Sequence, residues 1–210
     1  MAWDETCLIH AEEIQSPILR FYDWSEPTAT FGYFQKYHEA TQLTPLRPLI
    51  RRPTGGGLVP HTNDWTYSLI FPPSAPWYRN RAMESYVQLH EWLQMAFRAV
   101  GIITHIAPAQ NPEGPGRCFV GTEKHDLVLA GSKVAGAAQK RNRTGFLVQG
   151  SIQPPPTTVT RAQWGQALRA TAAGAWNVRW QPWSPPPTYS HQAEDLAHNK
   201  YRDSTYNEQR

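Results

Sequence analysis

Cysteine is scarce in this chain of 210 residues, which contains only Cys7 and Cys118. Two cysteines cannot build a disulfide framework, and in a reducing compartment both are free thiols. Long apolar runs are also missing, since no stretch approaches the roughly 20 residues that span a bilayer. The first ten residues lack the basic flank and apolar stretch of a signal peptide. We therefore expect a cytoplasmic protein with no membrane partner, in which either cysteine can be a nucleophile.

Charge of either sign is sparse, because only 18% of the residues are charged and the formal net charge is +3. The densest basic clusters, Arg51-Arg52 and Lys140 to Arg143, are too short to define a nucleic-acid surface. The histidines and cysteines lack the spacing of metal ligands, so no metal site is expected. A hydrophobic fraction of 40% and this length are typical of one folded domain, here residues 1–210.

Nineteen prolines and nine tryptophans predict many loops and extended segments. Runs rich in β-branched and aromatic residues or bounded by turns predict strands. They lie at 18–24, 28–34, 49–52, 64–71, 102–106, 118–120, 126–129, 133–140 and 146–152. The first two runs read as a strand pair, and the last five as a second, small sheet.

Helices are predicted where apolar residues recur at steps of three and four. They lie at 2–14, 83–100, 160–173 and 191–201. Asn80 is a suitable cap for the second helix and Gly101 a suitable stop. His90 lies on the apolar stripe of this helix, so it is interpreted as a core histidine. Helices that interrupt sets of strands indicate the α+β class.

The segment Arg51 to His61 contains paired arginines and the consecutive glycines Gly55, Gly56 and Gly57. Glycines let a backbone approach a ligand closely and direct N–H groups at negative charge. The spacing matches neither of the common nucleotide-binding loops. A purely structural turn between strands is the more frequent role of such a segment, so both readings stay open.

Cys118 and Lys133 lie near the beginnings of successive predicted strands and can face one another across a small sheet. A lysine ammonium beside a thiol favours the nucleophilic thiolate. The alternative is a small buried cysteine and a solvated lysine. The strand after Lys133 carries only small side chains at Gly136, Ala137 and Ala138, which suits either a tunnel for a long ligand or close packing.

Taken together, these segments resemble the biotin/lipoate A/B protein ligase family, which includes lipoate-protein ligases, octanoyltransferases and biotin-protein ligases. The similarity rests on RRPTGGGLVPH at 51–61, TYSL at 66–69, GSKVAGAAQKR at 131–141, and KY at 200–201 with Asn207. The segment 20–35 is similar to the early strands of the family. The resemblance implies the class II aminoacyl-tRNA synthetase/biotin-lipoate ligase-like fold, with a larger and a smaller mixed β-sheet flanked by helices.

The resemblance also implies roles for single residues. Lys133 is expected to contact the acyl carbonyl, and His61 is a weak candidate for the base. The acyl or acyl-adenylate pocket is expected to be lined by Arg51, Arg52, Thr54, Gly55, Gly56, Gly57, Gly136, Ala137 and Ala138. Cys118-Phe119 matches the cysteine of octanoyltransferases of the kind found in Gram-positive bacteria.

The implied activity is octanoyl transfer from acyl carrier protein to a lipoyl-domain lysine, by a ping-pong mechanism through a Cys118 thioester and without a cofactor. The acceptor is expected to be the glycine cleavage H protein or a 2-oxoacid dehydrogenase E2 subunit. These acidic carriers are expected to dock on Arg51, Arg52 and the Lys140 to Arg143 cluster. The end of the chain resembles the end of the catalytic domain, so no accessory domain is expected.

Two departures from the family pattern and one further feature keep alternatives open. Thr62 stands where an aspartate usually follows the loop histidine, and Gln149 replaces a common histidine. Gly57 gives three consecutive glycines, as in many ligases. One alternative is a ligase that uses ATP and Mg²⁺ to form an acyl-adenylate, in which Cys118 is incidental. The other is an acyl-binding protein that has lost turnover.

Overall fold

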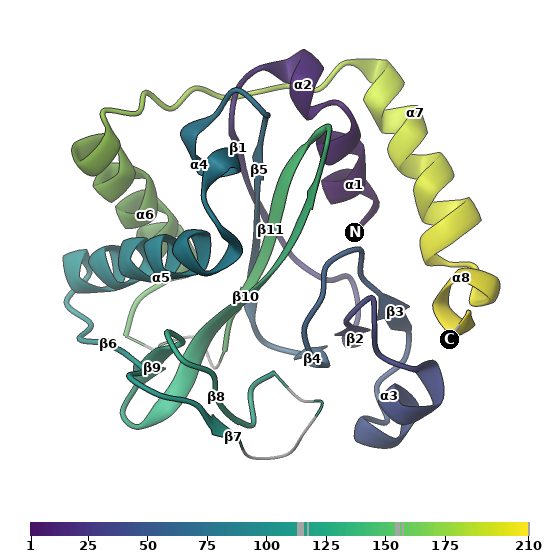
Figure 1. Ribbon diagram of the computed structural model, residues 1–210, viewed down its shortest axis with the longest axis horizontal. Coiled ribbons are helices and arrows are strands. Elements are labelled where there is room, and N and C mark those ends of the chain that lie inside the picture. Colours follow the sequence, from purple (N-terminus) through teal and green to yellow (C-terminus); the bar gives the residue numbers. More distant parts are fainter. Residues whose placement is uncertain (113–115, 117, 154–155, 157, 210) are drawn as a thin grey trace.

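The computed structural model describes residues 1–112, 116, 118–153, 156 and 158–209, and it contains a larger and a smaller β-sheet with flanking helices (Figure 1). The larger sheet has the strand order β1 (Ile18–Tyr22), β5 (Trp65–Phe71), β11 (Gly145–Ile152), β10 (Ser132–Asn142), β9 (Leu127–Leu129) and β6 (His105–Ile106). Each neighbouring pair in this sheet is antiparallel.

The smaller sheet has the order β3 (Leu49–Arg51), β2 (Thr28–Phe31) and β4 (Val59–His61). Strand β2 pairs with β3 in parallel and with β4 antiparallel. A further short pair joins β7 (Asn111–Pro112) to β8 (Gly121–Thr122). The predicted α+β class with a larger and a smaller sheet is confirmed, although only the smaller sheet is mixed.

Two predicted pairings are wrong. Strands β1 and β2 form as expected but lie in different sheets, because the turn at 25–27 carries the chain from one sheet to the other. The later strands build no small sheet of their own, since β11 pairs along its whole length with β5 and joins them to the larger sheet. Residues 118–120, predicted as a strand, form a turn and a bend.

The helices are α1 (Ala2–Ile9), α2 (Ala11–Ile14), α3 (Tyr37–Leu43), α4 (Pro76–Arg79), α5 (Ala82–Ala99), α6 (Arg161–Trp176), α7 (Pro187–Leu196), the π-helix η1 (Ala197–Tyr201) and α8 (Ser204–Glu208). The cap of α5 is Arg81 rather than the predicted Asn80, and its N–H donates to the Glu84 carboxylate. Gly101 follows the helix with a φ of +79°, which fits the predicted stop.

Side chains of the larger sheet alternate between two cores, as the two-residue period of a strand requires. Tyr67, Leu69 and Phe71 pack with α5 and α6, whereas Ile70 packs with α1. Figure 1 shows these two sets of helices on opposite sides of the sheet. On the α1 side the strand β5 becomes polar at Ser68 and Thr66, which are both buried. This polar stretch leads into the site described below.

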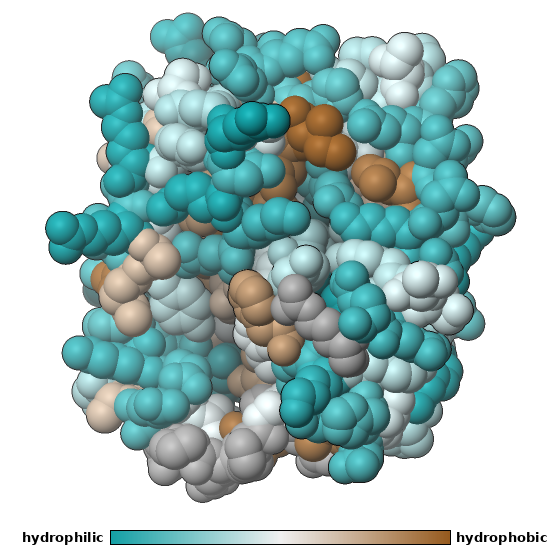
Figure 2. All heavy atoms as spheres, turned by 45° about the vertical axis from the view of Figure 1, so that its right-hand side comes forward, coloured by the Kyte–Doolittle hydropathy of each residue, from teal (hydrophilic) through white to brown (hydrophobic). Residues whose placement is uncertain are grey.

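The C-terminal segment is attached to α1 by a charged contact. The Glu5 carboxylate accepts hydrogen bonds from the Lys200 ammonium at 2.7 and 2.8 Å and from the Tyr201 hydroxyl at 2.7 Å. The KY pair noted in the sequence therefore has a structural role. On the face drawn in Figure 2, the described apolar side chains form small groups between hydrophilic ones. Within the described residues, no helix is long and apolar enough to cross a membrane.

His90 is a core residue, as predicted, and its side chain is fully buried. Its Nδ1 lies 3.0 Å from the carbonyl oxygen of Tyr86, one turn earlier in α5. Burial lowers the pKa of His90 from 6.5 to about 4, although the Asp126 carboxylate opposes the shift. The folded protein therefore holds this imidazole in its neutral form.

This lowered pKa predicts that acid weakens the fold. Below pH 6.5 the unfolded chain binds a proton at His90 while the folded protein does not, so the free energy of unfolding falls until about pH 4. A shift of this size corresponds to about 3 kcal/mol. Denaturant unfolding of the wild type and His90→Gln between pH 4 and 7 measures it, and the variant should show a smaller slope. Equal slopes would contradict the assignment.

Candidate active site

A narrow cavity lies where the larger and the smaller sheet meet, and a wider cavity of about 800 Å³ adjoins it. The two cavities share Cys118, Lys133 and Ala137. The narrow cavity receives side chains from both sheets and from the loops between them. It is lined by Met1, Tyr22, Thr30, Arg52, Val59, His61, Thr66, Cys118, Phe119, Lys133, Gly136, Ala137, Ala138, Gln149, Gly150 and Ser151.

Cys118 lies in a turn at the boundary of the two cavities and is half-buried. Its sulfur accepts a hydrogen bond from the Gly57 N–H, with 3.2 Å between N and Sγ. The Arg52 guanidinium also interacts with this sulfur. The sulfur therefore has an N–H dipole and a cation as neighbours, and both interact favourably with negative charge.

Arg52 is buried and holds the glycine loop in place. It donates to the carbonyl oxygen of Gly55 at 2.7 and 3.1 Å and to that of Gly57 at 2.6 Å. Its NH1 also donates to the Thr30 hydroxyl at 3.3 Å. Burial lowers the pKa of Arg52, and the Cys118 sulfur opposes that shift. One guanidinium therefore links the loop, the hydroxyl and the sulfur.

One part of the glycine loop lines the wider cavity, and another part is buried in the protein. Gly56 and Gly57 line the wider cavity, and Gly56 has a φ of +88°, in the left-handed region that favours glycine. Thr54 is buried and donates to the Gln149 side chain at 2.8 Å. Of the predicted pocket residues in this loop, Thr54 and Gly55 line neither cavity.

Arg51 was predicted to line the pocket, but its side chain is fully buried and lines neither cavity. It lies over the Phe31 ring and donates to the backbone oxygens of Tyr33 and Gln35, each at 2.7 Å. It also donates to the backbone oxygen of Asn207 in α8 at 2.9 and 3.2 Å. Arg51 therefore joins β3 to the C-terminal helix, and the pocket assignment is corrected.

Lys133 lines both cavities and is nearly buried. Its ammonium pairs with the Asp126 carboxylate at 2.7 Å and lies over the Phe119 ring at 5.2 Å from the centroid. The Tyr86 hydroxyl also donates to Asp126. Cys118 and Lys133 do not face one another across a sheet, because Cys118 lies in a turn. The structure nevertheless brings both to one cavity.

The small side chains of β10 leave space for Lys133 and for the cavity. A Cβ atom at Gly136 would lie 2.7 Å from Cε and 2.9 Å from Nζ of Lys133, so only glycine permits this position of the lysine. Ala137 and Ala138 line the narrow cavity beside it. The predicted run of small residues therefore borders the cavity, and one of them is required by the packing of Lys133.

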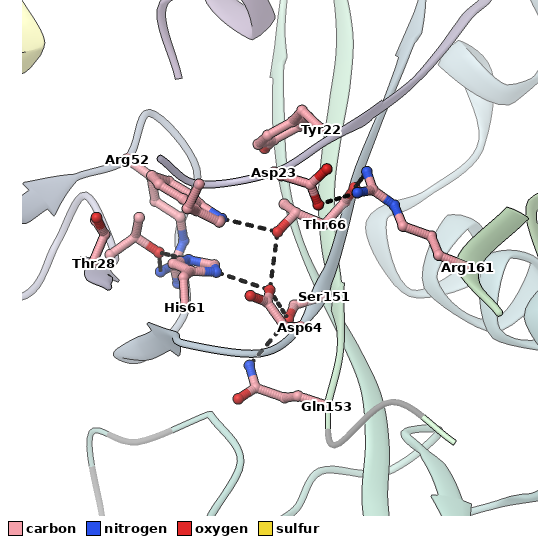
Figure 3. A network of polar contacts seen from close by, with 12 residues as sticks. Tyr22, Asp23, Thr28, Arg52, His61, Asp64, Thr66, Ser151, Gln153 and Arg161 are labelled. Atoms are coloured by element: carbon pink, nitrogen blue, oxygen red, sulfur yellow. Dashed lines mark hydrogen bonds and ion pairs between the residues drawn. The ribbon is translucent and has the colours of Figure 1, made fainter. Parts of the chain in front are cut away.

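His61 is buried and belongs to a network of polar contacts (Figure 3). Its Nδ1 is 2.9 Å from the Asp64 carboxylate, and its Nε2 is 2.9 Å from the Thr30 hydroxyl. The Trp24 ring stacks on the imidazole with 4.2 Å between centroids. Burial lowers the pKa of His61 below 6.5, although Asp64 opposes the shift. The imidazole is therefore neutral near pH 7.

The two departures from the family pattern have structural counterparts. A carboxylate does reach His61, but it comes from Asp64 rather than from the position of Thr62. Gln149 donates to the buried Asp4 carboxylate at 2.7 Å and accepts from Thr54 at 2.8 Å. His61 thus keeps a carboxylate partner, and the Gln149 amide links Asp4 to Thr54.

The predicted docking role of the arginine pair is wrong, because Arg51 and Arg52 are both buried. In the second basic cluster, Arg141 donates to the Asn80 backbone oxygen at 2.5 Å and lies over the Phe146 ring. Arg143 in the same cluster is exposed.

Three site residues were missed by the sequence analysis. Thr30 and Asp64 complete the surroundings of His61, and Asp126 holds Lys133. No local sequence pattern indicates a role for Thr30, because its partner His61 is 31 positions away in the sequence. Asp64 follows His61 by three residues, a spacing that was available in the sequence but is common in turns.

The sequence is similar to a known protein family and to individual members of it. Residues 1–154 match the family model of the lipoyl protein ligase A/B catalytic domain. The octanoyltransferase LipM of Staphylococcus aureus is 34% identical over 166 residues, which cover 72% of this chain and 60% of that protein. The chain therefore spans about three-fifths of the length of this relative.

Two solved structures have a similar fold. The protein Ta0514 from T. acidophilum gives a TM-score of 0.82 at 19% identity, covering 100% of this chain and 92% of that one. A lipoate-protein ligase A bound with ATP gives a TM-score of 0.79 at 19% identity, with coverage of 99% and 92%. At these identities the structural likeness shows the fold alone.

The surroundings of the two thiols predict different reactivity. Cys7 is fully buried, and burial raises its pKa to about 11, whereas Cys118 borders two cavities. Iodoacetamide at pH 7.5 should label Cys118 at least about tenfold faster than Cys7, since the accessible thiolate is the reactive form. Peptide mass spectrometry measures both rates. Cys7→Ala should label like the wild type, and equal labelling of both thiols would contradict the assignment.

Proposed function

Because the chain belongs to the family of lipoyl protein ligase A/B catalytic domains, we propose that it is an octanoyl-[acyl-carrier-protein]:protein N-octanoyltransferase. It moves an octanoyl or lipoyl group from acyl carrier protein to a lysine of a lipoyl-domain protein through a Cys118 thioester. The observation that carries this proposal is the position of the Cys118 sulfur between two cavities, beside the Gly57 N–H and Arg52. The relative named octanoyltransferase supports the choice of acyl group.

In the first half-reaction the Cys118 thiolate attacks the thioester carbonyl of the donor. A bond forms between Sγ and the carbonyl carbon, the bond to the carrier sulfur breaks, and the carrier leaves as a thiolate, which takes a proton from water. Negative charge develops on the carbonyl oxygen in the transition state. Lys133 is the candidate donor to this oxygen, because an ammonium has three N–H groups and pairing with Asp126 leaves donors free.

In the second half-reaction the acceptor lysine attacks the acyl-Cys118 as a free amine, and an amide replaces the thioester. The glycine cleavage H protein and 2-oxoacid dehydrogenase E2 subunits are the acceptors we propose. No cofactor enters this scheme, because the acyl group arrives already activated as a thioester. Gly136, Ala137 and Ala138 border the space for the acyl chain.

Intact-protein mass spectrometry tests the covalent step. Mixed with octanoyl carrier protein and without ATP, the wild type should gain the mass of one octanoyl group, and Cys118→Ala should gain none. Cys7→Ala is the matched control and should gain it like the wild type, because Cys7 lies in the core away from both cavities.

A different outcome would identify the ligase alternative. If the wild type gained no acyl group from the carrier but formed an acyl-adenylate from octanoate, ATP and Mg²⁺, the chain would be an acyl ligase. If it bound octanoate without either reaction, it would be an acyl-binding protein.

Gly136→Ala tests the position of Lys133. The added methyl group would displace the lysine side chain, which lies 2.7 Å from the Cβ position, so we expect acyl transfer to fall by about tenfold or more. Gly174→Ala in α6 is the control, because its Cβ would meet no atom within 4 Å and the change should leave transfer unaltered. The rate of Cys118 acylation is the measurement, and equal rates in both variants would contradict this role.

A further inference from the structure

A hydroxyl, an imidazole and a carboxylate form a chain of hydrogen bonds beside the narrow cavity. Thr30 comes from β2, His61 from β4, and Asp64 from the connection between β4 and β5; Figure 3 labels His61 and Asp64. The Thr30 hydroxyl is 2.9 Å from Nε2 of His61, and Nδ1 of His61 is 2.9 Å from Asp64. Thr30 and His61 line the same cavity as Cys118. The three groups are buried: Thr30 is 1% exposed and His61 is 5% exposed. The Asp64 side chain is 3% exposed.

The neighbouring hydrogen bonds determine where the protons lie. Asp64 accepts from the hydroxyl groups of Ser151 at 2.7 Å and Thr66 at 2.9 Å, which favour its ionised form. An ionised carboxylate can only accept, so Nδ1 of His61 must carry the proton. Nε2 is then the acceptor, and the Thr30 hydroxyl donates to it.

Both ring nitrogens of His61 already have a hydrogen-bond partner in this arrangement. Its Nδ1 is occupied by Asp64, its Nε2 by Thr30, and one ring face by Trp24. A proton from the cavity can reach Nε2 through the Thr30 hydroxyl, which lines the same cavity and is hydrogen-bonded to Nε2. Arg52 donates to this oxygen and also interacts with the Cys118 sulfur, so hydroxyl and nucleophile are within reach of one guanidinium.

We propose that Thr30 relays the proton of the attacking lysine amine to His61 in the second half-reaction, while Asp64 holds the imidazole in the accepting tautomer. This inference rests on the proposed function. Thr30 is the catalytic residue, since its oxygen meets the substrate. His61 and Asp64 act through it and are positioning residues.

As the amine nitrogen bonds to the acyl carbon, its N–H bond breaks and the proton moves to the Thr30 oxygen. The original Thr30 proton passes to Nε2 of His61, which becomes an imidazolium beside the Asp64 carboxylate. The bond between the acyl carbon and Sγ then breaks, and Sγ leaves as a thiolate that Arg52 and the Gly57 N–H stabilise. The imidazolium afterwards returns its proton to water.

Separate measurement of the two half-reactions tests the relay. Rapid mixing with octanoyl carrier protein gives the rate of Cys118 acylation, and adding a lipoyl-domain acceptor to the isolated acyl-enzyme gives the transfer rate. Thr30→Val should slow transfer by about 100-fold, the usual contribution of a general base, and change acylation by less than about threefold. Thr30→Ser keeps the hydroxyl and should restore transfer to within about threefold of the wild type.

One further variant tests the role of Asp64, and another serves as a control. Asp64→Asn should also slow transfer selectively, because an amide does not enforce the same tautomer. Thr28→Val is the matched control, since Thr28 lies on the same strand, is buried, and donates to the Glu26 backbone oxygen outside the array. We expect both of its half-reactions to stay within about threefold of the wild type.

The outcomes separate this inference from the proposed function. If the wild type forms acyl-Cys118 and transfers the group, but Thr30→Val slows both half-reactions equally or neither, the relay alone is overturned. Wild-type rates of transfer in Asp64→Asn would overturn it as well, even if Thr30→Val did not fold. If the wild type forms no acyl-Cys118, the proposed function fails and the relay fails with it.

Discussion

The buried Arg52 guanidinium is the contact on which the geometry of the site depends. It donates to two carbonyl oxygens of the glycine loop and to the Thr30 hydroxyl, and it interacts with the Cys118 sulfur. Burial of a cation is costly unless its donors are satisfied, so the loop must bring its carbonyl groups to this point. The same loop conformation directs the Gly57 N–H at the sulfur. A single buried charge thus sets both the loop and the surroundings of the nucleophile.

Both sheets contribute side chains to the cavity around Arg52. The apolar side of β5 and β11 in the larger sheet is covered by α5 and α6. The opposite side of β11 carries Gln149 and Ser151, which line the narrow cavity. The smaller sheet supplies Thr30 and His61. Asp64 lies in the connection between β4 and β5. It is hydrogen-bonded to His61 in the smaller sheet and to Ser151 in the larger sheet, so it links the two sheets at the site.

The paired arginines illustrate how adjacent residues acquire different roles. Strand β3 alternates its side chains, so Arg51 and the following Arg52 leave the backbone on opposite sides. Arg51 donates to the C-terminal helix α8 through Asn207, whereas Arg52 donates to the loop. Arg51 and Asn207 were both part of the motif read from the sequence, and their contact explains why they occur in one pattern.

The sequence by itself determined the α+β class, the position of most strands and long helices, and the core location of His90. It also pointed to Cys118 and Lys133, which the structure brings to one cavity. These follow from local periodicity and residue chemistry, which act over a few positions. Only the tertiary structure decided that β1 and β2 belong to different sheets, that Arg51 is structural, and that Thr30, Asp64 and Asp126 complete the site. Strand pairing and the partners of buried charges depend on which distant segments pack together, and in this chain those segments are brought together by burial of the two faces of β5.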